Sequence, residues 1–394
     1  MRKLFLLCGA PASGKSTFIK SHGLGDFTIS SDALRLLYRA PVYDVQGNWS
    51  ISQSDNKMVW NLLYSMVEER MKSGSVTFVD ATHTGKTAFS KYYALAKKYR
   101  YEIYVIQFHT PLEVCIKQNR GRKDTYRIVP DTVIREHYER LQRKVFPAFI
   151  HVIDADAWSL FESGQDMRSE NSEPLLVDLN EYQDVKVIGD IHGCYDAVRC
   201  AGFVAPDPNI AYIFTGDFLD RGPQNAEVLR WVLSIHNNQN VFMLEGNHER
   251  HLWDWVNDRE AVYSEFENRT KKQLDAASGI RKSQCAFLCK RLLPYLIVHY
   301  HGNIFYISHG GVSTRGAFSV YVPNELFIRG CGGYADLESV VESWNASRQE
   351  NEYMIHGHRN LKRHPIRESE GTFNLEGQVE SGGELRVLSL NTIQ

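Results

Sequence analysis

Residues 4–16 read LFLLCGAPASGKS, an apolar run followed directly by a loop with two glycines, a lysine and a serine. The loop fits the pattern G-x-x-x-x-G-K-S between a predicted strand, Leu4–Cys8, and a predicted helix, which is the context of a P-loop. Lys15 is expected to bring positive charge to the β- and γ-phosphates of ATP or another NTP, and Ser16 to offer its hydroxyl to Mg²⁺. The phosphate-binding residues expected here are Gly9, Ala12, Ser13, Gly14, Lys15, Ser16 and Thr17.

The segments that follow alternate between strand-like and helix-like patterns. Strands are expected at Val76–Val79 and Ile103–Phe108, and helices at Asn56–Met71, Ala88–Tyr99 and Asp131–Val145. The first of these helices is expected to place Val59, Leu62, Leu63, Met66 and Val67 on one face. This alternation predicts an α/β domain over residues 1–155, with a parallel sheet flanked by helices.

A polar pair follows the next strand candidate, residues 28–31. Asp32 and Arg35 are three residues apart at a helix start, so they share a face of that helix. A carboxylate at such a strand end can take a proton from an acceptor hydroxyl, while the arginine holds a nearby phosphate. The structural alternative is that Asp32 caps the helix.

Two further segments carry charge near the same sheet edge. Asp80 directly follows the strand Val76–Val79, where it can support Mg²⁺, position Ser16, or serve as an ordinary strand-end residue. Residues 119–130 read NRGRKDTYRIVP, four cations in eight residues around a glycine and an aspartate. This composition is typical of a mobile lid over phosphates, with a solvated charge cluster as the alternative.

Length and composition set outer bounds on the protein. The 394 residues exceed one ordinary domain, so two globular units are expected. The composition, 43% hydrophobic and 23% charged, argues against a disordered, fibrous or membrane protein, and the net charge of −2 excludes a basic coat over the whole chain. Seven cysteines without a C-x-x-C pair favour a reducing cytoplasm over a disulfide framework. We find neither a signal peptide nor an apolar stretch of about 18 residues, so no membrane contact is expected.

The periodic pattern fades over residues 156–184, which we interpret as a linker, with a long surface loop as the alternative. A second series of apolar strands follows at Val185–Gly189, Ala211–Thr215, Val241–Leu244 and Ile304–Ser308. Polar clusters stand at predicted strand ends: GDIHG (189–193), GDFLDRG (216–222), GNHE (246–249), HGG (309–311) and HGH (356–358). Asp, His and Asn side chains suit Mn²⁺, Fe or Zn²⁺, and two metals sharing a carboxylate activate water and clamp a phosphate. The ordered set predicts a binuclear metallophosphoesterase domain over residues 185–394.

The first half resembles a known family through GAPASGKS, SSDALR, VDATH and NRGRKDTYRIVP. It is similar to the polynucleotide 5′-kinase branch of P-loop phosphotransferases. The resemblance implies that Asp32 is the general base for a 5′-hydroxyl and that Arg35 contacts the acceptor's phosphate. It also implies that some of the lid arginines Arg120, Arg122 and Arg127 stabilise the phosphoryl group in transfer, and it leaves open which of them do so.

The second half resembles the calcineurin-like phosphoesterases, in the branch with protein serine/threonine phosphatases and diadenosine tetraphosphatases. The metal ligands that the resemblance implies are Asp190 and His192 for one metal, Asp217 as the bridge, and Asn247, His309 and His358 for the other. Arg221 is expected to contact the substrate phosphate, and His248, held by Asp220, to protonate the leaving oxygen. Mn²⁺ is the favoured metal, with Ni²⁺, Fe or Zn²⁺ as alternatives.

Four positions depart from the patterns of these families. The kinases often have Gly at the position of Ala12 and Asn at that of His83, and neither change removes a required proton or charge. His356 stands where the phosphoesterases often have an apolar residue, so it is a ligand, a hydrogen-bond donor behind a ligand, or packed. Glu376 replaces the usual Asp of the last strand pair, and its longer side chain can still orient a ligand.

The order of the two domains resembles that of bacterial polynucleotide kinase-phosphatases, which continue into a ligase domain, and phage end-healing enzymes share the same logic. It implies an α/β enzyme that phosphorylates 5′-OH ends with ATP and removes 3′-phosphate, 2′-phosphate or 2′,3′-cyclic phosphate. RNA or DNA ends would be its substrates, a separate ligase its partner, and the cytoplasm of a bacterium or phage-infected host its location.

Two alternatives come from other classes of protein. One is a protein or dinucleotide phosphatase fused to a small-molecule P-loop kinase. The other is a non-catalytic RNA-end-binding module, against which the intact Lys15, Asp217 and His248 argue, because binding alone does not need them. The sequence leaves open the choice between RNA and DNA and the oligomeric state.

Overall fold

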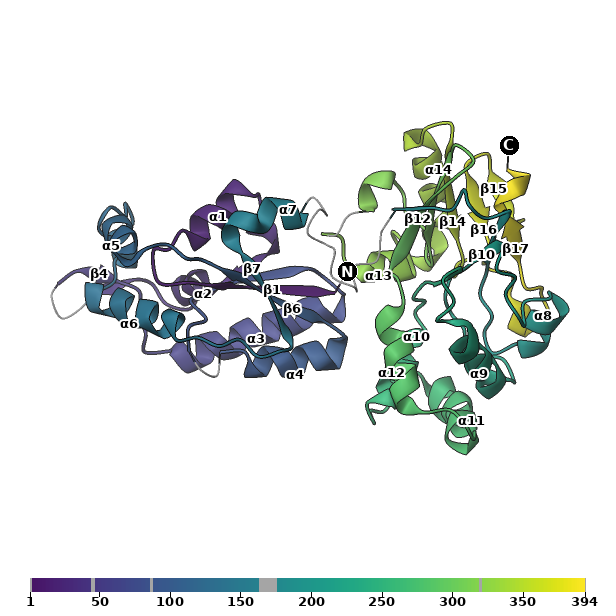
Figure 1. Ribbon diagram of the computed structural model, residues 1–394, viewed down its shortest axis with the longest axis horizontal. Coiled ribbons are helices and arrows are strands. Elements are labelled where there is room, and N and C mark those ends of the chain that lie inside the picture. Colours follow the sequence, from purple (N-terminus) through teal and green to yellow (C-terminus); the bar gives the residue numbers. More distant parts are fainter. Residues whose placement is uncertain (1, 44–46, 86–87, 163–175, 319–320, 394) are drawn as a thin grey trace. The chain divides into compact units, whose positions relative to one another are not determined.

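The computed structural model describes residues 2–43, 47–85, 88–162, 176–318 and 321–393. The chain divides into two compact units, Met1–Ser172 and Glu173–Gln394, and each is an α/β structure (Figure 1). All seven cysteines are free. Within the described ranges, no helix has both the length and the apolar character needed to cross a membrane.

The first unit is built on a five-stranded parallel sheet in the order β2-β5-β1-β6-β7. The strands are β1 (Lys3–Cys8), β2 (Thr28–Ser30), β5 (Thr77–Asp80), β6 (Glu102–Gln107) and β7 (Ile150–Asp154). The helices are α1 (Lys15–Ser21), α2 (Ser31–Tyr38), α3 (Asn56–Lys72), α4 (Ser90–Tyr99), α5 (Leu112–Arg120), α6 (Asp131–Gln142) and α7 (Trp158–Glu162). A small hairpin, β3 (Val42–Tyr43) and β4 (Trp49–Ser50), and the 3₁₀ turns η1 (Gly25–Phe27), η2 (Thr125–Arg127) and η3 (Ala155–Ala157) complete it.

Helices cover both faces of this sheet. On one face, α3 and α4 pack against residues such as Leu4 and Leu6 of β1. On the other face, Phe5 of β1 stacks on Phe78 with ring centroids 4.6 Å apart and meets Trp158 at 5.3 Å. Because alternate residues of a strand point to opposite faces, a continuous apolar run such as β1 is what a sheet covered on both sides requires.

The buried stripe of α3 is narrower than we expected. Val59, Leu63 and Val67 are buried, whereas Leu62 and Met66 are 42% and 37% exposed. The buried residues follow an i, i+4 spacing, and Met71 continues it. The i+3 positions Leu62 and Met66 lie on the flank of that stripe, so the face on which we expected the five residues is buried only along Val59, Leu63 and Val67.

We expected residues 156–184 to form a linker, but a helix lies near the start of this segment and a strand near its end. Trp158 in α7 is buried against Phe5 and Phe78 of the first unit. At the other end, β8 (Leu176–Asp178) pairs in parallel with β12 (Tyr295–Tyr300) of the second unit. Residues 163–175 of the expected linker lie outside the described residues.

The second unit contains two facing sheets. The four-stranded sheet has the order β11-β10-β9-β17, with β9 (Asp184–Ile188), β10 (Ile210–Phe214), β11 (Val241–Met243) and β17 (Val387–Ser389). The six-stranded sheet has the order β15-β16-β14-β13-β12-β8, with β13 (Asn303–Ser308), β14 (Glu352–His356), β15 (Arg367–Ser369) and β16 (Thr372–Asn374). Val185, Val187 and Ile213 of the first sheet pack against Leu296 and Phe305 of the second.

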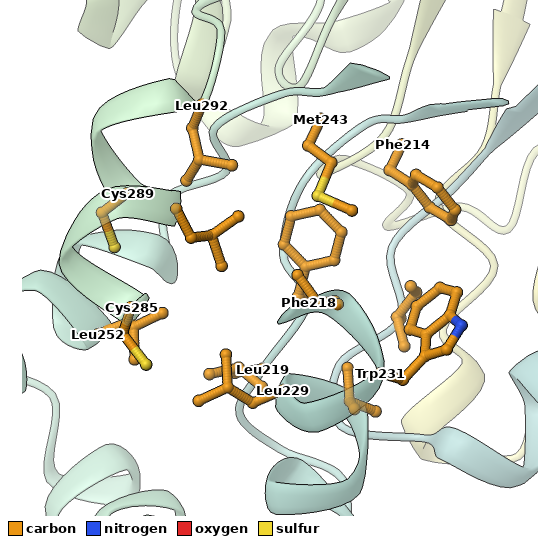
Figure 2. Packing of buried hydrophobic residues seen from close by; sticks show 14 of the residues in the cluster. Phe214, Phe218, Leu219, Leu229, Trp231, Met243, Leu252, Cys285, Cys289 and Leu292 are labelled. Carbon is orange, nitrogen blue, oxygen red and sulfur yellow. The ribbon is translucent and has the colours of Figure 1, made fainter. Parts of the chain in front are cut away.

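Helices cover the outer faces of these two sheets. The four-stranded sheet is covered by α8 (Tyr195–Cys200), α9 (Asn225–Ile235), α10 (Glu249–Val256), α11 (Lys271–Ala276) and α12 (Lys282–Arg291), whose apolar residues form one cluster with the sheet. In Figure 2, Phe214 of the sheet lies beside Trp231 of α9 and Met243 beside Phe218, and Cys289 of α12 belongs to the same cluster. On the other sheet, α13 (Asn324–Arg329) and α14 (Leu337–Ser347) contribute Phe327 and Trp344 to a separate core. The expected α/β class of both domains is confirmed.

Candidate active sites

The loop between β1 and α1 has the curled backbone that a P-loop needs. Ala12 and Gly14 have φ angles of 60° and 95°, both in the left-handed region. Glycine adopts this region freely, whereas an L-residue with a Cβ pays roughly 1–2 kcal/mol. The departure at Ala12 therefore introduces backbone strain into the loop without removing any polar group.

Lys15 lies inside this loop. It is 8% exposed, and its Nζ donates to the carbonyl oxygens of Gly9 at 2.9 Å and Ala10 at 2.7 Å. Burial lowers the pKa of its ammonium group, and the nearby carboxylate of Asp80 opposes that shift. The structure thus places one buried cation at the centre of the candidate phosphate cradle.

Asp80 and Ser16 form a pair of oxygen donors beside Lys15. The Ser16 hydroxyl donates to Asp80 Oδ2 at 3.4 Å. Burial raises the pKa of Asp80, Lys15 lowers it, and the charge of Asp32 adds to the rise, so three charged groups lie within electrostatic range of one another. Hydroxyl and carboxylate oxygens are ligands that Mg²⁺ accepts, so Ser16 and Asp80 fit such an ion.

The expected acceptor pair is present at the start of α2. Arg35 Nη1 donates to Asp32 Oδ1 at 2.9 Å, and Arg35 Nη2 donates to Asn56 Oδ1 of α3 at 2.7 Å. The helix cap is Ser30, whose hydroxyl accepts from the amide of Ala33, so the alternative that Asp32 caps α2 was wrong. The Asp32 side chain is 52% exposed and the Arg35 side chain 10%, which leaves the carboxylate open to a substrate.

The three lid arginines differ in their surroundings. Arg122 donates to the carbonyl of Arg127, and although burial lowers the pKa of Arg122, the carboxylates of Asp32 and Asp80 act to raise it. Arg120 instead pairs with Asp131 at the start of α6, with its side chain 69% exposed. Arg122 thus interacts electrostatically with Asp32 and Asp80, and Arg127 with Asp80.

One lid residue escaped the sequence reasoning. Asn119 is fully buried, its Nδ2 donates to the carbonyl of Val129 at 2.8 Å, and its Oδ1 accepts from the amide of Val129 at 3.2 Å. These two hydrogen bonds hold the two ends of the lid segment 119–129 together. The only signal in the sequence was a buried-type polar residue at the end of a helix.

The second site lies where six strands end. Asp190 follows β9, Asp217 follows β10 and Asn247 follows β11, while His309, His358 and Glu376 follow β13, β14 and β16. Gly246 and Gly357 precede two of these residues, and a Cβ at either glycine would collide with a carboxylate oxygen of Asp217 or Asp190. The glycines of the motifs thus allow the polar loops to close on one another.

Asp190, His192 and Glu376 form one group of candidate ligands, with ligand atoms within 4.8 Å of one another. Burial, together with the charges of Glu376 and Asp217, raises the pKa of Asp190 well above its usual range. His192 Nδ1 donates to the carbonyl of Leu219 at 3.2 Å, and burial lowers its pKa to about 3. The imidazole is therefore neutral, and its Nε2, which lies 3.0 Å from Arg221 Nη1, is the nitrogen that can bind a metal.

Asp217, His309 and His358 form the second group, also within 4.8 Å. His309 Nδ1 donates to the carbonyl of Thr215 at 3.0 Å, which turns Nε2 toward Asp217 Oδ2 at 3.2 Å and Asn247 Oδ1 at 3.4 Å. Burial lowers the pKa of His358 to about 2, so this imidazole is neutral. Asp217 Oδ2 is buried and accepts no hydrogen bond from the described residues.

These groups fit two divalent cations. The two adjacent carboxylates Asp190 and Glu376 are buried together, and an ion between them would neutralise their repulsion. The orphaned oxygen of Asp217 stands between the groups, where a bridging ligand belongs. Nitrogen and oxygen donors of this kind suit Mn²⁺, Fe or Zn²⁺. Glu376, which we expected only to orient a ligand, lies among the candidate ligands themselves.

His248 is held beside the candidate metal ligands. Its Nδ1 lies 2.7 Å from Asp220 Oδ2, and the Thr270 hydroxyl donates to the other oxygen of that carboxylate. Burial opposes the charged form of His248, but Asp217 and Asp220 outweigh it and raise the pKa of the imidazole. The raised pKa favours the imidazolium and Asp220 orients the ring, so His248 is suited to deliver a proton from Nε2.

Arg221 faces the same space. Its Nη1 donates to His192 Nε2 at 3.0 Å and to Glu380 Oε1 at 3.2 Å. Burial disfavours its charge, but Asp217 and Glu380 raise the pKa further, so the guanidinium is permanently cationic. Its φ of 64° is left-handed, as are those of Asp217 and Asp220, and such strained backbone clusters at functional sites.

Glu249 was quoted within GNHE but given no role. It is buried, and its two oxygens accept from the backbone amides of Asp217 at 3.0 Å, Phe218 at 2.9 Å and Gly246 at 2.7 Å. One side chain therefore ties together the two loops that carry Asp217 and Asn247. His356 is buried and lies 3.0 Å from Glu368 Oε2, outside the groups of candidate ligands, so of its three expected roles the packed one fits.

Comparisons with known proteins match the two units of the chain to two different families. Residues 4–148 match the AAA domain family and residues 184–377 match the calcineurin-like phosphoesterase family. The bis(5′-nucleosyl)-tetraphosphatase (asymmetrical) of Halalkalibacterium halodurans is 25% identical over 230 residues, 53% of this chain and 90% of the relative. The Bacillus subtilis protein of the same name is 23% identical over 216 residues, 50% and 87% of the two chains. A protein serine/threonine phosphatase structure from Saccharomyces cerevisiae covers 57% of this chain and 74% of its own, at 17% identity and a TM-score of 0.33.

The fold, the candidate sites and the family matches agree on two different α/β units in one chain. The first unit carries a P-loop and matches the AAA domain family, and the second matches the calcineurin-like phosphoesterase family and is similar to bis(5′-nucleosyl)-tetraphosphatases.

Proposed function

We propose that the protein is a bifunctional enzyme that heals broken nucleic-acid ends. The first unit would transfer the γ-phosphate of ATP to a 5′-OH end. The second would remove a 3′-phosphate, 2′-phosphate or 2′,3′-cyclic phosphate. The products, a 5′-phosphate and a 3′-OH, are what a separate ligase joins.

The observation that carries this proposal is the pair Asp32–Arg35 beside the P-loop. Asp32 is exposed enough to accept the proton of an acceptor hydroxyl as its oxygen attacks the γ-phosphorus and ADP leaves. Arg35, fixed by Asn56, offers a guanidinium to a phosphate next to that hydroxyl. The 5′-OH end of a nucleic acid is an acceptor of this kind, because its first internucleotide or 3′ phosphate lies close to the hydroxyl.

The transferred group would be held from two sides. Lys15 and the amides of its loop would bind the β- and γ-phosphates, and Ser16 and Asp80 would hold Mg²⁺. Arg122, which interacts electrostatically with Asp32 and Asp80, would cover the phosphoryl group from the lid.

In the second unit, two divalent cations held by Asp190, His192, Asp217, Asn247, His309 and His358, with Glu376 beside them, would supply Lewis-acid charge and an activated water. Arg221 would hold the phosphate oxygens. The P–O bond to the ribose would break as His248 gives its Nε2 proton to the leaving oxygen, while Asp220 stabilises the imidazolium.

The test is to offer the purified chain γ-labelled ATP and a 5′-OH oligonucleotide, and separately oligonucleotides ending in 3′-phosphate, 2′-phosphate or 2′,3′-cyclic phosphate with Mn²⁺. We expect label on the 5′ end and release of phosphate from at least one 3′ end. Failure of both reactions contradicts the proposal.

A second candidate function comes from the relatives of the second unit. They carry the name bis(5′-nucleosyl)-tetraphosphatase, which favours a dinucleotide phosphatase fused to a kinase of small molecules. Rapid hydrolysis of a dinucleoside tetraphosphate, with no action on any oligonucleotide end, would support this reading over ours.

A further inference from the structure

The hairpin after α2 presents a stacked aromatic pair to solvent. Tyr43 of β3 stands opposite Trp49 of β4, and their ring centroids are 4.4 Å apart with planes inclined by 32°. Tyr43 is 64% exposed and Trp49 45%, while Leu37 and Tyr38 at the end of α2 are also exposed. Large apolar faces left in water at one place mark a surface that something covers.

The position of the hairpin indicates which kind of molecule covers the aromatic pair. The acceptor residue Asp32 lies in the first turn of α2, which ends at Tyr38, about 9 Å further along the helix at a rise of 1.5 Å per residue. β4 contacts η2, the lid turn that carries Arg127, and Figure 1 shows β4 near α5 and α6, which flank the lid. The aromatic pair therefore lies on a hairpin that follows the helix of the acceptor pair and contacts the lid.

Charge points to the same partner. The lid holds four cations, Arg120, Arg122, Lys123 and Arg127, against Asp124. Arg39, next to Tyr38, is half exposed and pairs with Asp55 at 2.9 Å. Proteins bind single strands without sequence preference by two means. Cations contact the phosphate backbone, and aromatic rings beside them stack on the bases.

We propose that Tyr43 and Trp49 form a stacking platform for the bases that follow the 5′-terminal nucleotide of a single-stranded acceptor. The proposal rests on the proposed 5′-kinase function and names its substrate class. Every base offers a π-face, so the platform selects for unpaired strands and not for sequence. Bases of a blunt duplex are paired and stacked on one another, so such an end reaches the platform only after it frays.

The kinetic test compares two acceptors, a single-stranded 5′-OH oligonucleotide and a nucleoside 3′-monophosphate, which has no following base. The double variant Tyr43→Ala, Trp49→Ala is expected to raise KM for the oligonucleotide by about 5- to 100-fold, the effect of removing base stacking. Its kcat, and both constants for the nucleoside 3′-monophosphate, are expected to stay at the parent values. Tyr43→Phe and Trp49→Phe keep the rings and are expected to keep the parent KM.

The first unit offers a matched control pair. Tyr93 and Phe149 also stack, with centroids 4.2 Å apart, and are 44% and 38% exposed. Phe149 precedes β7, whereas the P-loop follows β1, so in a parallel sheet this pair lies at the opposite edge. Tyr93→Ala is expected to change neither KM.

The results separate this proposal from the proposed function. If the double variant keeps the parent's KM for the oligonucleotide, the platform proposal is wrong. It is also wrong if the KM for the nucleoside 3′-monophosphate rises by the same factor as the KM for the oligonucleotide. If the parent transfers no phosphate to either acceptor, binding of a fluorescent single strand decides. Binding that weakens in the double variant supports the platform while the kinase function fails, and binding that does not weaken overturns both.

Discussion

His83 makes the stability of the first unit depend on pH. The side chain is 4% exposed, and its two ring nitrogens lie 2.7 Å from the carbonyl oxygen of Leu7 and 3.2 Å from the hydroxyl of Tyr92. Burial lowers its pKa to about 4, from an ordinary 6.5. In the unfolded chain the imidazole regains the ordinary value, so between pH 6.5 and pH 4 only the unfolded state takes up this proton.

The sign and size follow from this difference. The contribution of neutral His83 is fully present above pH 6.5 and is lost as the pH falls toward 4, since unfolding then binds a proton that the native state does not. At about 1.4 kcal/mol for each pH unit in that window, acidification from pH 7 to pH 4 is expected to cost about 3 kcal/mol of unfolding free energy.

The assay is urea unfolding of the full chain at a series of pH values, followed by a hydrogen-exchange pulse at one fixed pH. Peptides that span β1 and β5 report the first unit. In His83→Asn, the unfolding free energy is expected to fall by about 3 kcal/mol less between pH 7 and pH 4 than in the parent. This difference does not depend on how the substitution changes the unfolding free energy at pH 7. His109→Asn, at an exposed histidine, is the control. If His83→Asn keeps the slope of the parent, the buried neutral imidazole is not the cause.

The remaining predictions concern the two sites. Arg122→Ala is expected to lower the kcat of phosphoryl transfer to a 5′-OH by about 10²-fold or more, and Arg120→Ala to leave it near the parent value; equal losses would contradict the geometry of the lid. Ala12→Gly is expected to raise the unfolding free energy of the first unit, or leave it unchanged, because relief of strain is set against the flexibility of glycine; a loss above about 1 kcal/mol in urea unfolding would contradict it. His248→Ala is expected to lose about 10²–10⁴-fold on a 3′-phosphate end but much less on p-nitrophenyl phosphate, with metal content unchanged; equal losses or lost metal would show another role. Glu249→Ala leaves three buried amides without an acceptor, and we expect about 10- to 100-fold weaker metal binding in a chelator titration; parent affinity would refute this.

Much of the fold could be predicted because the strands of both units are apolar runs that end in polar motifs. The predicted strand Leu4–Cys8 is observed as Lys3–Cys8, and Val241–Leu244 as Val241–Met243. A strand covered on both faces must be apolar throughout, so its limits are visible in composition alone. The exposure of Leu62 in α3 was not visible, because which apolar residues on a helix are covered depends on the partner that packs there.

The residues of the site were less evenly predictable. Strand-end residues such as Asp190 and His309 stand in short glycine-containing motifs, and the resemblance of this ordered set to a known family implied that they meet at one site. Glu249 and Asn119 form hydrogen bonds with backbone groups of other residues. Every residue has such groups, so no motif or spacing in the sequence predicts these partners. The difference between Arg120 and Arg122 depends on the turn η2, which folds one toward the acceptor pair and leaves the other to Asp131.

The central claim is that two separate sites in this chain repair opposite ends of one strand. It is tested most directly by one oligonucleotide with a 5′-OH and a 3′-phosphate, incubated with ATP and Mn²⁺ and analysed by mass spectrometry of both ends. We predict that the parent yields 5′-phosphate and 3′-OH, that Asp32→Asn changes only the 3′ end, and that Asp217→Asn changes only the 5′ end. Intact ends in the parent, under conditions in which it hydrolyses a dinucleoside tetraphosphate, would contradict the account.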